Sequence, residues 1–105
     1  MGKKLKYRFT ATAFSELEDI LSYISIQLSN PDAADSLCRN IEKALEGACH
    51  YPQMYPVYKR DKLKFSVRRI AFRNYAVFYS VDEDRSVLVV EHIVSTKQNL
   101  TFIFG

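Results

Sequence analysis

Hydrophobic and polar residues alternate at the start of the chain. Between Lys4 and Thr10, the apolar residues Leu5, Tyr7 and Phe9 occupy one side and charged or polar residues the other. This period of two predicts a half-buried strand with a cationic outer face. Cations on such a face are typical of a strand at the edge of a sheet, where they discourage pairing with other chains.

The pattern changes to a helical period after residue 11. Apolar residues recur at spacings of three and four, which predicts an amphipathic helix from about Thr12 to Leu28. Thr10 or Thr12 can cap its start. The buried stripe is expected to consist of Phe14, Leu17, Ile20, Leu21, Ile24 and Leu28. Three acids near the start, Glu16, Glu18 and Asp19, are expected on a solvated face that suits the helix dipole.

A second helix is predicted after a short link. Asn30 is a favourable N-cap, and Pro31 suits the first helical position because its missing N–H has no partner to lose there. The apolar stripe that follows extends to about Cys49 and consists of Ala34, Leu37, Cys38, Ile41, Leu45 and Ala48. A link this short predicts an antiparallel helical hairpin. The next segment, Tyr51–Val57, contains two prolines and is expected to be a loop whose two tyrosines and Met54 cover the end of the core.

Three further strands are predicted after this loop. They cover Phe65–Phe72, Tyr75–Val81 and Val87–Val94, and Arg73-Asn74 forms the first turn because Asn tolerates a left-handed backbone. The second of these strands is apolar on both faces and the third nearly so, which is typical of the interior of a sheet.

The order of these elements predicts an α+β domain of two layers. An N-terminal strand precedes the antiparallel helical hairpin, and a three-stranded antiparallel meander follows it. The hairpin is expected to cover one face of the sheet. The length, 105 residues, is that of a single domain spanning residues 1–105.

Charge is segregated along the sequence. Residues 11–58 carry seven acids against two cations, whereas residues 59–81 carry one acid, Asp61, against seven cations. The seven cations are Lys59, Arg60, Lys62, Lys64, Arg68, Arg69 and Arg73. A surface polarised in this way is expected to attract a polyanion or an acidic peptide.

Several functional classes lack support in the sequence. It has no Gly-rich phosphate loop, no pair of His or Cys with metal-ligand spacing and no nucleophile elbow, so neither a metal nor a cofactor is expected. No apolar run approaches the roughly 20 residues of a membrane span, and no apolar region follows the N-terminal cations. A cytoplasmic protein without a membrane partner is therefore expected.

Three further residues have ordinary structural interpretations. Cys38 and Cys49 lie eleven residues apart in one predicted helix, a rise of roughly 16 Å, so they are too distant for a disulfide. They are expected to be small core or surface residues. His92 alternates with Val90 and Val94 and is expected to be a hydrogen-bonded sheet residue rather than an acid or base.

The segment Lys59–Val81 carries the candidate functional chemistry. Arg68 and Arg69 are adjacent on a predicted strand and therefore point to opposite faces, so one can be buried or paired while the other projects. Arginine binds phosphate bidentately, and a neighbouring Tyr can stack on bases. The alternative is a basic surface that serves solubility only. The candidate phosphate- or target-binding residues are Lys62, Lys64, Arg68, Arg69 and Arg73.

An ordered set of motifs resembles the RelE/ParE superfamily of bacterial toxins. The set comprises Asn30-Pro31-x-Ala33-Ala34, Tyr51-Pro52, Val67-Arg68-Arg69-Ile70, Asn74-Tyr75-Ala-Val-Phe-Tyr79-Ser-Val81 and a final apolar strand. The resemblance covers nearly the whole chain and implies a RelE/ParE-like fold. It also implies the toxin of a type II toxin–antitoxin (plasmid stabilisation) module. The expected partner is a small acidic antitoxin that wraps the toxin, often across the sheet and the helical hairpin, in a hetero-oligomer.

The same resemblance separates two modes of action. RelE-like endonucleases tend to carry Arg after the strand tyrosine and Tyr, Arg or His after the last strand, whereas this chain has Ala76 and the segment Ser95–Asn99. These departures favour a ParE-like toxin that binds an essential target, DNA gyrase, without catalysis. One alternative is a RelE-like, metal-independent, ribosome-dependent mRNA endonuclease (mRNA interferase), with Arg68, Arg69 and Lys97 as candidate catalytic residues that hold the phosphate. A further alternative is a basic interaction module without toxicity.

Overall fold

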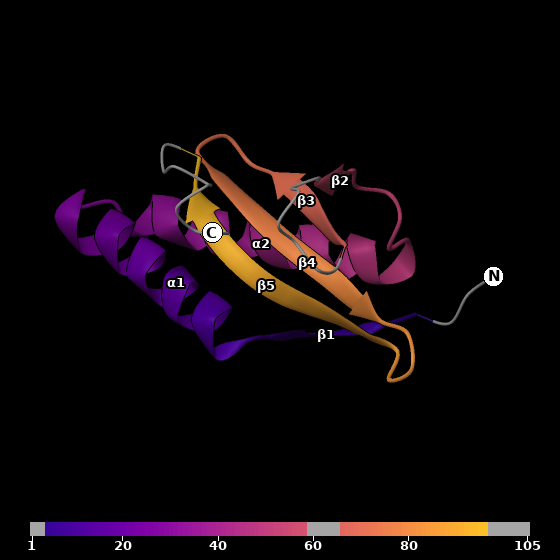
Figure 1. Ribbon diagram of the computed structural model, residues 1–105. Coiled ribbons are helices and arrows are strands. Elements are labelled where there is room, and N and C mark those ends of the chain that lie inside the picture. The colour runs from indigo at the N-terminus through magenta and orange to yellow at the C-terminus, as the bar shows by residue number, and fades with distance from the viewer. Residues whose placement is uncertain (1–3, 59–65, 97–105) are drawn as a thin grey trace.

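The protein forms a mixed sheet with two helices packed against one of its faces (Figure 1). The computed structural model describes residues 4–58 and 66–96. In chain order, its elements are β1 (Lys6–Phe9), α1 (Ala11–Ser22), the π-helix η1 (Tyr23–Gln27), α2 (Pro31–His50), β2 (Val57–Tyr58), β3 (Val67–Ala71), β4 (Tyr75–Asp82) and β5 (Val87–Ser95). Within these residues the sheet has five strands in the order β1-β5-β4-β3-β2. The predicted α+β class with two layers is confirmed.

The first strand pairs in a direction that the sequence did not predict. β3, β4 and β5 form the expected antiparallel meander, but β1 runs parallel to β5, with Lys6 opposite Val87 and Phe9 opposite Val90. The sheet is therefore mixed, and β1 forms one of its edges. Alternation along a strand indicates which face is buried but carries no information about the direction of its neighbour, so the pattern left this pairing open.

The opposite edge is formed by a strand that was expected to be loop and basic segment. β2 contains only Val57 and Tyr58, which pair antiparallel with Arg68 and Val67. A two-residue strand that follows Pro56 is too short to produce a periodic signal. The meander consequently has a fourth strand, and β3 lies inside the sheet.

The first predicted helix is present, but its last turn is a π-helix and two residues of its expected buried stripe are exposed. Thr10 caps α1 by accepting a hydrogen bond from the Ala13 N–H at 3.0 Å, and the α-helix ends at Ser22, where η1 begins. Phe14 and Leu28, expected in the buried stripe, are each 54% exposed, whereas Ala13 is fully buried. The middle of the stripe, Leu17, Ile20 and Ile24, is buried or half-buried as predicted. At the start of α1 the small Ala13, rather than Phe14, faces the sheet.

The second helix agrees with its prediction. Asn30 Oδ1 accepts a hydrogen bond from the Ala33 N–H at 3.1 Å, and Pro31 is the first helical residue. The buried side chains of α2 are Ala34, Ile41, Leu45, Ala48 and Cys49. Cys49 is buried, Cys38 is half-buried, and both thiols are free, as expected.

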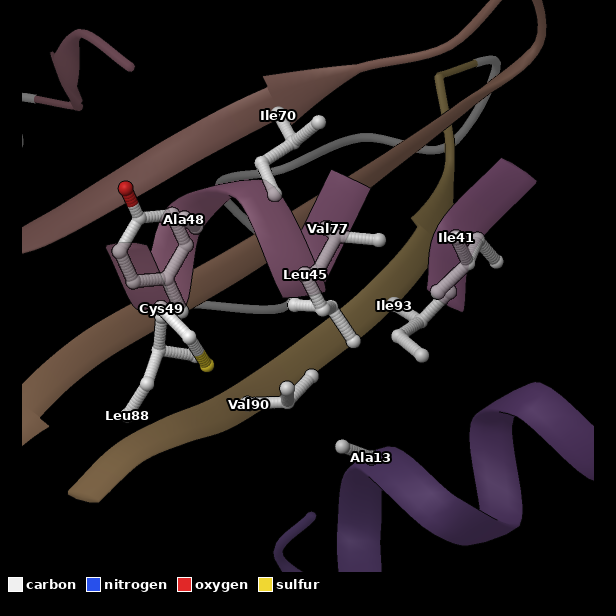
Figure 2. Close-up of a cluster of buried hydrophobic side chains, with 11 residues drawn as sticks. Ala13, Ile41, Leu45, Ala48, Cys49, Ile70, Val77, Leu88, Val90 and Ile93 are labelled. Carbon is white, nitrogen blue, oxygen red and sulfur yellow. The ribbon is translucent and has the colours of Figure 1, made fainter. Parts of the chain in front are cut away.

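The main core lies between the helices and one face of the sheet. Figure 1 shows α2 crossing behind the sheet and α1 lying along the side of β5. Figure 2 shows the side chains that meet there, and the cluster contains Ala13, Ile41, Leu45, Ala48, Cys49, Ile70, Val77, Tyr79, Leu88, Val90 and Ile93. A second cluster, formed by Val67, Ala76, Phe78 and Val94 with Tyr58 packed against it, belongs to the other face. Strand β4 contributes to both clusters, which confirms its predicted interior position.

Positive backbone φ occurs at serines rather than at the expected asparagine. Within the described ranges, the non-glycine residues with positive φ are Ser29, at the link between the helices, and Ser86, before β5. Arg73 and Asn74 do form the turn between β3 and β4, but Asn74 does not adopt the left-handed conformation that was expected.

Two expectations concern residues outside the described part of the chain. These are the basic segment up to Lys64 and most of Ser95–Asn99. Among the described helices, none is long and apolar enough to cross a bilayer.

Candidate functional site

Arg68 anchors the loop that joins α2 to β2. It lies on β3 opposite Tyr79, on the helix-covered face of the sheet. Its Nη1 donates a hydrogen bond to the Tyr55 carbonyl at 2.7 Å and is 3.5 Å from the Gln53 carbonyl oxygen. A charged donor strengthens such bonds, so this guanidinium stabilises the loop backbone as well as adding positive charge.

Tyr79 makes a second attachment between the sheet and the same loop. Its side chain is fully buried, and its hydroxyl donates to the Pro52 carbonyl at 2.7 Å. The Tyr55 ring packs edge-on against it, with ring centroids 6.4 Å apart. Burial raises the pKa of Tyr79 to about 12, so the phenol stays protonated and serves as a donor.

The loop and the neighbouring strands line an open groove. It has a volume of about 980 Å³ and is bordered by the end of α2, the loop, β2, β3, β4 and the turn before β5. Tyr51 and Met54 were expected to cover the core but are 68% and 55% exposed on the groove, so only Tyr55 of the loop packs inward. Sequence reasoning missed the groove because it depends on where the loop is anchored.

Arg69 lies on the other face of the sheet. It pairs in register with Phe78, whose ring contacts Tyr58 with centroids 4.9 Å apart. The Arg69 Nε is buried and has no hydrogen-bond partner in the described part of the chain. Buried polar groups are nearly always hydrogen-bonded, so an Nε without a partner among the described residues is an exception in this fold.

The predicted binding residues are separated rather than gathered. Arg68 and Arg69 point to opposite faces, as predicted, and Arg73 is exposed in the turn between β3 and β4. The remaining predicted site residues, Lys62, Lys64 and Lys97, lie outside the described residues. The two strand arginines therefore lie on different faces of the sheet rather than in one row, and Arg68 is also bound to loop carbonyls.

His92 is a bonded residue of the sheet, as expected, and its partner is Glu16. The His92 Nδ1 lies 3.2 Å from Glu16 Oε1, and the Ile93 N–H donates to the same carboxylate oxygen at 3.0 Å. The hydrogen bond with Glu16 raises the pKa of His92, although burial acts in the opposite direction. The prediction that Glu16 lies on a solvated face was wrong. No local pattern identifies a contact between residues this far apart in sequence.

Metal ligands do not cluster in the described part of the chain. No group of three or more His, Cys, Asp or Glu side chains that could hold an ion occurs there.

The comparisons with known proteins identify the family. A family model described as the ParE toxin of the type II toxin–antitoxin system parDE matches residues 7–100. The chain belongs to this ParE toxin family. No curated protein sequence matches it significantly.

Two solved structures share the fold of this ParE family member. The chromosomal ParDE toxin–antitoxin system from P. aeruginosa superposes with a TM-score of 0.68 at 12% identity, covering 90% of this chain and 98% of that one. The RelBE2 toxin–antitoxin complex from Mycobacterium tuberculosis gives 0.59 at 17% identity, covering 89% and 99%. The resemblance stated from the sequence is confirmed: the protein is a toxin of the type II toxin–antitoxin class with a ParE/RelE-like fold.

Proposed function

We propose that this toxin inhibits bacterial growth by binding DNA gyrase, without catalysis, and that a small acidic antitoxin neutralises it in a hetero-oligomer. Membership of the ParE family supports a binding toxin. The structural neighbours are toxin–antitoxin complexes, which supports a cognate antitoxin.

One observation carries the preference for binding over catalysis. Proton transfer in metal-independent RNA cleavage needs an accessible acid or base whose pKa lies near the working pH. The Tyr79 phenol is buried and donates to the Pro52 carbonyl, and its pKa is raised to about 12, so it is unsuited to proton transfer at neutral pH. Position 76, where RelE-like toxins tend to carry Arg, is a buried Ala.

A second candidate function rests on Arg69. An mRNA endonuclease of the RelE type needs cations to hold the scissile phosphate, and the half-buried Arg69 on the face opposite the helices is the candidate for this contact. In this alternative, Arg69 would act with Lys97 and the other predicted cations on ribosome-bound mRNA. The likeness to RelBE2 is at the level of fold and favours neither target.

Tightly controlled expression in bacteria separates the candidates. Filamentation and DNA damage in cells, together with inhibition of purified gyrase in a supercoiling assay, are expected for the proposed function. Rapid loss of protein synthesis with transcripts cut at defined positions would instead identify an mRNA endonuclease. Normal growth during full expression of soluble protein would leave only a basic interaction module.

Two controls make the result specific. Co-expression of the cognate antitoxin should restore growth, and the purified pair should elute together in size-exclusion chromatography. The double variant Arg68→Ala, Arg69→Ala should lose toxicity while remaining soluble. If its toxicity equals that of the wild type, neither arginine belongs to the target-binding site.

A further inference from the structure

Among the described residues, the outer edge of β2 carries backbone groups that no neighbouring strand uses. Val57 lies opposite Arg68, and the Arg69 N–H donates to the carbonyl of Pro56 at 3.0 Å. This bond makes Val57 and Arg68 a non-hydrogen-bonded pair, in which the N–H and C=O of each residue point away from the partner. Because β2 is the last strand in the sheet order, these groups of Val57 point out of the sheet edge.

The groove beside this edge presents an apolar surface. Tyr51, Met54 and Val57 all line it and are all exposed, with Val57 at 41%. Tyr79, Arg68 and Val57 follow one another in register across three strands, so their side chains share the face that opens to the groove. A strand added beyond β2 would continue this row and place alternate side chains over the groove.

Arg68 supplies the charge that selects the occupant. One of its nitrogens, Nη1, is held by the carbonyls of Tyr55 and Gln53, so the guanidinium is fixed at the groove wall with further N–H groups available. The other carboxylate or basic side chains among the described residues of the wall are Glu83, on the turn before β5, and His50 at the end of α2. A carboxylate beside β2 therefore meets a preoriented arginine rather than an acid.

We propose that this groove receives an extended acidic segment of the antitoxin, which pairs with Val57 at the edge of β2. Apolar side chains of the segment pack on Tyr51 and Met54, and one carboxylate binds Arg68. The proposal rests on the proposed function, because it locates the antitoxin of the same toxin. In this proposal the loop after α2 recognises the partner. Arg68 and Tyr79 hold the loop in position for this role by their hydrogen bonds to its carbonyl groups.

Val57→Pro is the sharpest test of the proposal. Proline removes the outward N–H but leaves the bond between Pro56 and Arg69 in place, since the Val57 N–H takes no part in pairing with β3. We expect at least a tenfold rise in the Kd of the full-length cognate antitoxin, measured by calorimetry. Hydrogen exchange of the wild-type complex should show new protection at the Val57 amide.

Met54→Glu tests the same surface if the proline variant does not fold. Its side chain is exposed, and the new carboxylate would repel an acidic segment, so at least a tenfold loss of affinity is expected; Met54→Leu should bind within about twofold of the wild type. Ile26→Glu, at an exposed apolar residue of η1, adds an acid to the helical hairpin and tests that surface separately. Asn74→Glu, at an exposed residue of the turn between β3 and β4, is the matched control for an added acid away from both surfaces.

The outcomes separate this proposal from the proposed function. If the antitoxin binds Val57→Pro and Met54→Glu as tightly as it binds the wild type, the groove is not its binding site. The toxin–antitoxin function would still stand. Loss of affinity in Ile26→Glu alone would locate the antitoxin on the helical hairpin and overturn the proposal. Failure of the antitoxin to bind the wild type would overturn both.

Discussion

Glu16 and His92, which are 76 residues apart in sequence, are joined through a carboxylate and an imidazole nitrogen at 3.2 Å. The contact attaches α1 to the part of β5 that lies beyond the end of β1. Strand β1 pairs with β5 as far as Val90, and beyond that point the Glu16 carboxylate accepts the hydrogen bond of the Ile93 N–H. A side chain of a helix thus satisfies the edge of the sheet where the neighbouring strand has ended.

This contact predicts a pH dependence of stability. The folded-state pKa of His92 is raised above its ordinary value of 6.5, mainly by the hydrogen bond with Glu16. The protonated imidazole therefore stabilises the fold fully below the unfolded-state value, and this contribution is lost as the pH rises through the folded-state pKa. The free energy of unfolding of wild type minus that of His92→Gln should be larger at pH 6 than at pH 8.5 in urea titrations.

Glu16→Gln is the matched variant for this experiment. It keeps an oxygen that can accept from the Ile93 N–H but removes the negative charge that raises the His92 pKa. The pH-dependent part of the stability should therefore shrink in Glu16→Gln. An unchanged pH profile in this variant would contradict the role assigned to the pair.

Tyr79→Phe should destabilise the protein without disturbing its packing. The ring stays in the core, but the Pro52 carbonyl loses the donor at 2.7 Å, which costs about 1–2 kcal/mol of unfolding free energy. Chemical denaturation measures this cost. In an alkaline absorbance titration, the wild type should contain a phenol that ionises near the pKa of about 12 and is missing from the variant. Tyr51→Phe, at an exposed tyrosine, should leave the stability unchanged.

The two strand arginines should differ in their effects on stability and on toxicity. Arg68→Ala removes the donor of the loop carbonyls and should lower the unfolding free energy by about 1–3 kcal/mol, with faster hydrogen exchange in the loop. Arg69→Met removes a buried nitrogen that has no partner and keeps the length of the side chain, so its stability should lie within about 1 kcal/mol of the wild type or above it.

Growth assays complete this comparison of the arginines. If Arg69 contributes to target binding as proposed, Arg69→Met should reduce toxicity although the protein remains folded. Full toxicity in a stable Arg69→Met variant would exclude Arg69 from target binding. A stability loss larger than that of Arg68→Ala would show that Arg69 is a structural residue.

Core truncation should distinguish Leu45 from Phe14. Leu45 is fully buried in the main cluster, so Leu45→Ala should cost about 2–5 kcal/mol through lost contacts and a cavity. Phe14 is 54% exposed, and Phe14→Ala should cost less than about 1 kcal/mol. Thermal and urea unfolding measure both. Equal losses would mean that Phe14 packs in the core as its periodicity first suggested.

Local patterns predicted most of the elements of this fold. Asn30 and Pro31 located the start of α2 because a cap needs only neighbouring residues, and the apolar strand from Tyr75 was placed inside the sheet because both of its faces are hydrophobic. The buried stripe of the first helix was right in its middle, at Leu17, Ile20 and Ile24, and wrong at its ends, where Phe14 and Leu28 are exposed. Strand β2 was missed because two residues carry no period.

The candidate site was predicted less completely than the fold. The sequence by itself determined the family, the basic character of the strand and the opposite orientation of Arg68 and Arg69, since strand alternation fixes that relation. Only the tertiary structure decided that Arg68 is bound to the loop, that Arg69 has an unbonded nitrogen and that Glu16 meets His92. These features depend on how elements distant in sequence pack against one another. The periodic pattern of hydrophobic residues within one element carries no information about that packing.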